Sequence, residues 1–210
     1  MTEVVITGIG QTPVGEFWER SLRSLAADAI KAAIRDAGGL KPQAMYVGNF
    51  LASVVSHQSN LGALLADNAG LDGIEAYTVE AAEASGAAAF RVGYLAVASG
   101  FVDVALVLGV EKYTDQVGAG LLSAVAQSGD YDYEVMQGVT PAAQAGMLMQ
   151  RYLHQYQTPR EAFGEFPMLC HANAVGNPNA MFRRPLESGA YQRAAMLCDP
   201  LNLFDMAAYA

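Results

Sequence analysis

The sequence predicts an α/β fold built around a mostly parallel β-sheet. Up to residue 110, short apolar runs rich in β-branched residues alternate with longer segments in which apolar residues recur at helical spacing. Two of the short runs, 3–10 and 102–110, are apolar almost throughout, as buried parallel strands are. Glycine follows the helical segments, where a residue with left-handed backbone commonly ends a helix.

Strands are expected where β-branched and apolar residues run together: 3–10, 44–50, 76–81 and 102–110. Helices are expected where the helical spacing lies between these strands: 21–37, 57–69 and 85–98. The first helix has the clearest limits, because Ser21 precedes it and Gly38 follows it. Successive strands joined by helices form right-handed crossovers, so we expect helices on both faces of the sheet.

The regular alternation ends after residue 113. Residues 114–140 carry four glycines among polar residues, which predicts an irregular loop or lid. Helical spacing returns at 141–157, and Thr158-Pro159 begins a further helix that runs to His171. The last residues are apolar and lack a polar cap, which we interpret as a chain cut where another strand follows. A docked terminal segment is the alternative.

Composition excludes several classes of function. The chain is 52% hydrophobic and 16% charged, which is typical of a packed globular protein and not of a disordered one. It has a net charge of −9 and no basic segment, so we expect neither a nucleic acid nor an anionic membrane surface as partner. Cys170 and Cys198 lack metal-site or disulfide-framework spacing, and the longest apolar run is too short to span a bilayer. We therefore expect a cytoplasmic protein without a metal site.

The densest group of candidate functional residues lies at 78–89, where a strand passes through a short turn into a helix of small side chains. Glu83 stands at the start of that helix. Unpaired amides and the helix dipole favour an anion at such a position, by about 0.3–1 kcal/mol at exposed sites. The alternative is an acidic first-turn residue that stabilises its own helix.

Several stretches together resemble the N-terminal half of the thiolase family, in particular its sterol-carrier-protein-type and archaeal acetyl-CoA acetyltransferase branch. They are GIGQTPVGE, RSLRSLAADAIKAAIRDAG, YVGN, HQSNLGALLADNAGL, VEAAEASGAAAFRVGYLAVASGFVDVALVLGVEKYTD, NPNAMFRRP and DPLNLFD. The resemblance implies a thiolase-like fold in which residues 1–113 form the first βαβαβαβ half. Residues 114–200 would be an inserted loop domain that forms the lid and the acyl-CoA entrance, and 201–210 a truncated return toward the core. The final strand of this half and the whole second half would be absent from the chain.

The sequence departs from the family pattern at the nucleophile. The resemblance aligns Glu83 with the family's nucleophilic cysteine, within a Cys-Ala-Ser-Gly pattern that here ends in Ser85 and Gly86. A thiolate at a helix N-terminus accepts an acyl group from CoA, whereas a carboxylate is a poor acceptor. We therefore expect no ordinary acyl-enzyme, and an altered catalytic role for Glu83. The family's catalytic histidines and second cysteine belong to the second half, and His57, His154 and His171 match none of the motifs.

Phe182, Arg183 and Arg184 lie in a stretch that resembles the loop-domain segment near the CoA entrance. Guanidinium groups suit the phosphates of CoA, and an aromatic ring suits its adenine. With Ser85 and Gly86, they form the predicted substrate-binding set. The alternative for the arginine pair is a solvated turn.

The resemblance thus implies a subunit of an acyl-CoA-handling enzyme that makes or breaks carbon–carbon bonds, as an acyltransferase or an aldolase-like lyase. CoA would enter as part of the substrate, with no tightly bound cofactor. A companion chain of second-half type would complete the site, in a homo- or hetero-oligomer, and a small OB-fold and zinc-ribbon protein is a second candidate partner. The alternatives are a non-catalytic thiolase-like subunit, or a truncated or engineered fragment in which Glu83 replaces cysteine.

Overall fold

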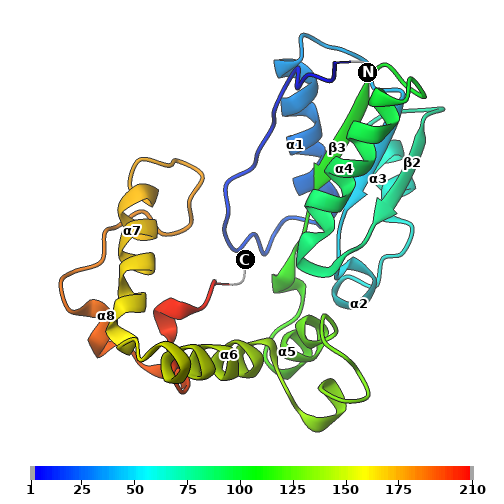
Figure 1. Cartoon of the computed structure of the whole chain (residues 1–210). Coiled ribbons are helices and arrows are strands. Elements are labelled where there is room, and N and C mark those ends of the chain that lie inside the picture. Colours follow the sequence, from blue (N-terminus) through cyan, green and yellow to red (C-terminus); the bar gives the residue numbers. More distant parts are fainter. Residues whose placement is uncertain (1–2, 209–210) are drawn as a thin grey trace. The chain divides into compact units, whose positions relative to one another are not determined.

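The computed structural model describes residues 3–208 and divides them into two compact units (Figure 1). The first unit comprises the described residues up to Thr12 together with Glu16–Val117. The second comprises Pro13–Gly15 and the described residues from Gly118 onward. Within the described residues, no helix is long and apolar enough to cross a membrane.

The first unit is a three-stranded parallel sheet covered by helices on both faces. Its elements are α1 (Leu22–Asp36), β1 (Ala44–Gly48), α2 (Ala52–Val55), α3 (Leu61–Asn68), β2 (Glu75–Val79), α4 (Ser85–Ala98) and β3 (Ala105–Gly109). The strand order is β2-β1-β3, with Ala44 opposite both Glu75 and Ala105. The central strand β1 is buried along its whole length. The predicted α/β class with a parallel sheet is therefore confirmed.

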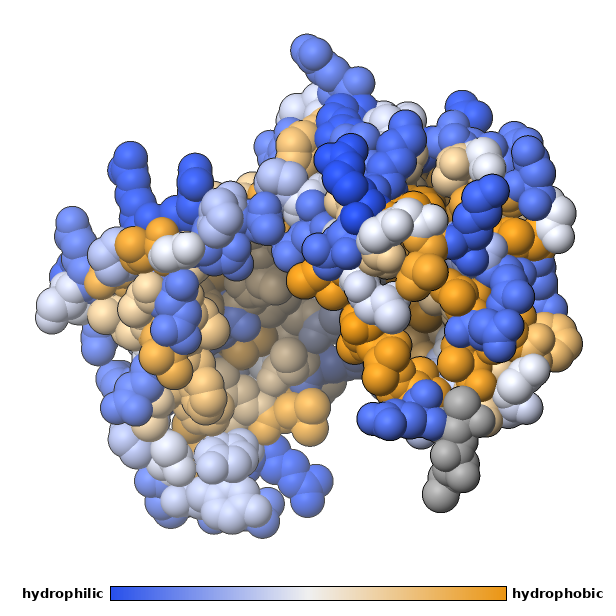
Figure 2. All heavy atoms as spheres, turned by 90° about the horizontal axis from the view of Figure 1, so that it is seen from above, coloured by the Kyte–Doolittle hydropathy of each residue, from blue (hydrophilic) through white to orange (hydrophobic). Residues whose placement is uncertain are grey.

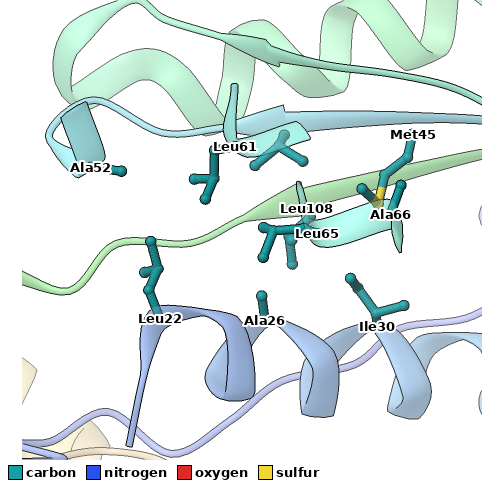
Figure 3. Packing of buried hydrophobic residues seen from close by; sticks show 10 residues of the cluster. Leu22, Ala26, Ile30, Met45, Ala52, Leu61, Leu65, Ala66 and Leu108 are labelled. Carbon is teal, nitrogen blue, oxygen red and sulfur yellow. The ribbon is translucent and has the colours of Figure 1, made fainter. Parts of the chain in front are cut away.

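Alternating side chains of β1 supply two cores. Met45 and Val47 face α1 and α3, whereas Ala44 and Tyr46 face α4. In Figure 3, the apolar face of α1 points at the sheet and at α3, through the labelled residues Leu22, Ala26, Ile30, Met45, Leu61, Leu65 and Leu108. Burying one aliphatic side chain of this size contributes about 1.5–3 kcal/mol, so this contact is the main stabilisation of the unit.

Local sequence sets the limits of α1. The Ser21 side chain accepts a hydrogen bond from the Ser24 backbone N–H at 3.2 Å, which satisfies one unpaired amide of the first turn. At the other end, Gly38 and Gly39 adopt positive φ angles of 70° and 83°. Such backbone is easy only for glycine, so the helix ends where the sequence predicts.

The prediction of a strand at 3–10 is wrong, because this segment pairs with no described strand. It runs along α1 instead, so closely that a Cβ on Gly8 would lie 2.6 Å from the Ala33 carbonyl oxygen. The Ile9 N–H donates to the Asp36 carboxylate at 2.9 Å rather than to a sheet. Most of its β-branched side chains remain exposed, Ile9 by 75%. One edge of β3 is also unpaired among the described residues.

Two other expectations need correction. The helix expected at 57–69 begins only at Leu61, because His57 and Asn60 have positive φ angles of 51° and 54° that interrupt helical backbone. The loop or lid expected at 114–140 contains a helix, α5 (Ala119–Ala126), which follows Gly118. The segment 114–140 therefore contains more regular structure than its glycine-rich composition predicts.

The second unit is mainly helical. After α5 come α6 (Pro141–Tyr156), the 3-10 helix η4 (Arg160–Gly164), α7 (Glu165–Ala174), α8 (Ala190–Arg193), β4 (Met196–Cys198), β5 (Leu201–Asn202) and the 3-10 helix η5 (Leu203–Asp205). The strands β4 and β5 form a small antiparallel pair. Tyr191 is buried and donates from its hydroxyl to Asp205 at 2.8 Å, while Asn202 donates to the Tyr191 carbonyl at 2.8 Å. These bonds hold the end of the described chain against α8.

The two buried tyrosines predict a loss of stability at alkaline pH. Burial, reinforced by hydrogen bonds to Glu75 and Asp205 respectively, raises the pKa of Tyr46 and of Tyr191 from 10.0 to about 12. Because folding raises these pKa values, the stabilisation is fully present below about pH 10 and is lost as the pH rises through about 12. Unfolding free energies measured by denaturant titration across this range should therefore fall.

The double variant Tyr46→Phe, Tyr191→Phe serves as the control. It should lose less stability between about pH 10 and 12 than the wild type, since neither position ionises. An equal loss in both proteins would show that these two phenols do not couple folding to pH.

Candidate functional site

The start of α4 touches the carboxyl end of β1. A Cβ on Gly48, the last residue of β1, would lie 2.6 Å from the Ser85 carbonyl oxygen and 2.7 Å from the Gly86 nitrogen. Any larger residue would push the helix away, so glycine allows this approach. In open parallel α/β sheets, ligands bind at the carboxyl ends of the strands, which is where residues 80–86 lie. We call residues 80–86 the corner.

Ser85 holds the corner together. It is buried, its hydroxyl accepts the Ala81 N–H at 2.9 Å and donates to the Ala82 carbonyl at 2.6 Å. Both bonds lie within the turn that links β2 to α4. The structure therefore gives Ser85 a role in shaping the turn, and its predicted contact with substrate stays a prediction.

Backbone strain precedes Glu83. Ala82 adopts a left-handed conformation, with φ at 48°, and its N–H donates to the Glu80 carboxylate. For a residue with a Cβ this conformation costs about 1–2 kcal/mol. Strained backbone of this kind is concentrated at functional sites, where the surrounding structure holds it.

Glu83 and Gly86 are open to solvent at the corner. The Glu83 side chain is exposed and forms no hydrogen bond or ion pair with any residue in 3–208. A Cβ on Gly86 would have no neighbour within 4 Å among residues 3–208, so nothing in the described part of the chain requires a glycine there. The sequence placed Glu83 at the start of the helix, and it lies in the 3-10 turn η1 (Ala82–Ala84) immediately before α4. The corner thus presents a carboxylate and bare backbone side by side.

A polar network beside the corner was missed by the sequence analysis. Glu111, just after β3, accepts the backbone N–H groups of Phe50 and Leu51 at 2.9 and 3.1 Å. It also accepts the Asn49 side-chain amide at 3.0 Å, and the Asn49 oxygen accepts the Ala52 N–H at 2.9 Å. Together they cap the start of α2. The sequence feature that could have predicted this cluster is the presence of polar residues directly after two adjacent parallel strands.

The same segment also contacts the end of α2. Lys112 is buried and forms an ion pair with Asp115, which accepts a hydrogen bond from the Ser56 hydroxyl at 3.0 Å. Residues 111–115 therefore fix both ends of α2 at the carboxyl edge of β1 and β3. This clamp determines the shape of the rim next to Gly48.

The second unit contains a pocket lined by Val175, Met181, Arg183 and Arg184, with a volume of about 460 Å³. Both arginine side chains are exposed at its wall, and Phe182, which directly precedes them in the chain, is about half exposed. The arginines form no ion pair with any carboxylate of the described chain. Two free guanidinium groups at one pocket suit a phosphorylated ligand.

The predicted site residues therefore fall into two groups, one in each unit. Glu83, Ser85 and Gly86 lie at the corner of the first unit, and Phe182, Arg183 and Arg184 lie at or beside the pocket of the second. Across residues 3–208, no group of three or more His, Cys, Asp or Glu side chains is arranged to hold a metal ion. Cys170 is exposed and Cys198 is half-buried, and both are free thiols.

Comparisons with known proteins agree with the resemblance seen in the sequence. A family model described as thiolase, N-terminal domain, matches residues 4–188. The acetyl-CoA acetyltransferase of Methanothermobacter thermautotrophicus is 40% identical over 207 residues, which cover 98% of this chain and 54% of that protein. A steroid side-chain-cleaving aldolase of Thermomonospora curvata is 30% identical over 210 residues, covering 95% and 52%.

Among solved structures, one described as an Ltp2-ChsH2(DUF35) aldolase matches with a TM-score of 0.75 and 28% identity. The match covers 97% of this chain and 52% of that one. The chain therefore spans about half the length of the relatives it matches.

The clamp predicts a large stability difference between two glutamates. Glu111→Ala removes the acceptor of three hydrogen bonds and leaves the backbone amides of Phe50 and Leu51, just before α2, unpaired, so the free energy of unfolding should fall by about 2–3 kcal/mol. Glu83→Ala removes no contact within the described chain and should change it by less than about 0.5 kcal/mol. Denaturant titration of both variants tests this. Similar values for the two would contradict the clamp.

Proposed function

The chain belongs to the thiolase family, and on this basis we propose that it is one half of an acyl-CoA-handling enzyme whose site is completed by a companion polypeptide. The observation that carries the proposal is the open corner. Glu83 and Gly86 are exposed at the carboxyl edge of the sheet, on a helix start that Gly48 holds against β1. Such a corner offers a carboxylate and approachable backbone to a substrate.

The arginine pocket supports CoA as part of the substrate. Arg183 and Arg184 supply two cations that form no ion pair with any described residue, and Phe182 supplies an exposed ring. Guanidinium groups bind phosphate oxygens in paired hydrogen bonds, and a ring can stack on adenine. In this proposal the pocket holds the nucleotide end of CoA, and no cofactor is tightly bound.

Glu83 is the proposed general base. In a retro-aldol cleavage, the carboxylate takes the hydroxyl proton of a 3-hydroxyacyl-CoA and the adjacent carbon–carbon bond breaks. A carbonyl product forms, and the CoA thioester leaves as an enolate that is then protonated. A base of this kind works best when burial raises its pKa toward neutrality. Glu83 is exposed in this chain, so the substrate and the companion must supply that burial.

The first unit has surfaces suited to a companion. One edge of β3 has no strand partner in the part of the chain that the structure describes, and the segment 3–10 exposes Val5, Ile6 and Ile9. An unpaired strand edge and exposed β-branched side chains are costly in water, and a further strand would cover both. Hydrophobic side chains reach the surface in several places, seen in orange in Figure 2.

Oligomer formation and a second partner belong to the same proposal. Strand β2 is the other edge of the sheet, and α4 exposes Phe90, Tyr94 and Leu95 by about half each. This face is proposed as the contact between subunits. The aldolase structure similar to this chain is described with ChsH2(DUF35), which supports a complex with a partner chain, and an OB-fold and zinc-ribbon protein stays the predicted second partner. A cytoplasmic location stays a prediction from the sequence.

A non-catalytic thiolase-like subunit is the second candidate function. The exposure of Glu83 and its lack of polar partners within 3–208 favour it, because a base is usually fixed by hydrogen bonds. In that case the corner would shape a partner's site without taking part in proton transfer.

Native mass spectrometry of the untagged protein, purified from its source and followed by titration with acyl-CoA, tests the proposal. The proposal expects a complex with a second polypeptide of thiolase second-half type, and CoA binding by that complex. A chain that appears alone and binds no CoA would contradict it.

Glu83→Gln separates the two candidate functions. If Glu83 is the base, the turnover of the complex should fall by about 10²–10⁴-fold with assembly unchanged, because the amide cannot take a proton. Asp72→Asn, at an exposed carboxylate outside the corner, is the matched control and should retain full turnover. Full activity of Glu83→Gln would exclude the base and leave the non-catalytic role.

A further inference from the structure

We propose that His171 is a positioning residue for the arginine pocket: it fixes the segment 182–184 against α7 and so sets where Arg183 and Arg184 present their charges. This inference rests on the proposed function, since it concerns the same pocket. His171 matches none of the catalytic motifs of the family, and the proposed role is one of positioning and not of catalysis.

The first contact is a hydrogen bond to the arginine segment itself. The Nδ1 of His171 lies 3.1 Å from the carbonyl oxygen of Arg184. A carbonyl oxygen only accepts, so Nδ1 carries the proton and donates. The bond therefore ties the backbone of the second arginine directly to α7.

Aromatic contacts hold the same ring on two sides. Phe182 stacks against His171 with ring centroids 6.2 Å apart and an interplanar angle of 18°. Phe204 meets it edge-on, at 5.9 Å and 89°. The imidazole is thus fixed between two rings, one of which belongs to the arginine segment.

The pocket wall continues along the same face of the helix. Val175, which lines the pocket, follows His171 by four residues, and residues at this spacing lie on one face of a helix. The segment from Met181 to Arg184 is therefore anchored to α7 at His171, and Val175 lines the same pocket. Neither arginine has an ion pair within 3–208 to fix it otherwise.

A hydrogen bond and a ring contact can be removed separately at this position. His171→Asn keeps a side-chain N–H near the place of Nδ1 but removes the ring. His171→Phe keeps a ring but removes the donor. The matched control is His154→Ala, because His154 is exposed on α6 and its side chain has no contact that holds the pocket.

The experiment titrates the complete protein, with any polypeptide that co-purifies, using adenosine 3′,5′-bisphosphate and pantetheine, the two ends of CoA. Arg183→Ala and Arg184→Ala serve as reference variants. We expect His171→Phe to weaken bisphosphate binding by about threefold to tenfold, the equivalent of one lost hydrogen bond. His171→Asn should stay within about twofold of the wild type, His154→Ala should match the wild type, and pantetheine binding should not change in any of them.

The tautomer gives a second readout that needs no substitution. Nitrogen NMR of the labelled wild-type protein should show the His171 proton on Nδ1. A proton on Nε2 alone, or unchanged bisphosphate binding in His171→Phe while the arginine variants lose it, overturns the positioning role and leaves the proposed function intact. Absence of bisphosphate binding in the wild type overturns both.

Discussion

The contact between the backbone of Gly48 and the start of α4 is the constraint on which the first unit depends. A side chain at Gly48 would meet the Ser85 carbonyl at 2.6 Å, so only a glycine allows α4 to begin against the end of β1. This contact fixes α4 on one face of the sheet while α1 and α3 cover the other. It also forces the chain through the tight turn at 80–84, with Ala82 in a left-handed conformation. The contact between Gly48 and the start of α4 therefore determines both the packing of the first unit and the shape of the corner.

Parts of the fold that follow from local chemistry were predictable. The limits of α1 follow from the Ser21 cap and two glycines, and β1 follows from an apolar run that is buried on both faces. The segment 3–10 has equal β-propensity but pairs with nothing in the described chain, because propensity does not supply a hydrogen-bonding partner. Likewise, the glycines of 114–140 led to the prediction of a loop, although the apolar residues after Gly118 form the helix α5.

The candidate site was predictable in part. Glu83, Gly86 and the arginine pair stand out because residue type and neighbours in sequence identify them. The hydrogen bonds of Glu111 to Asn49 and Phe50 join residues about sixty positions apart in the sequence. No local sequence pattern predicts which backbone N–H groups will donate to a given glutamate. For Ser85, the motif predicts a substrate contact, which stays a prediction. The motif does not reveal that the Ser85 hydroxyl forms two hydrogen bonds within the turn.

The most direct test of the account is the acyl-CoA affinity of Gly86→Ala in the purified complex. A Cβ there has no neighbour within 4 Å among the described residues, and it lowers the conformational entropy of the unfolded chain. The variant should therefore be as stable as the wild type or more so, by up to about 1 kcal/mol. If the corner receives the substrate, the added methyl group should weaken binding by about tenfold or more. Unchanged affinity in a stable Gly86→Ala complex would contradict the claim that acyl-CoA binds at this corner.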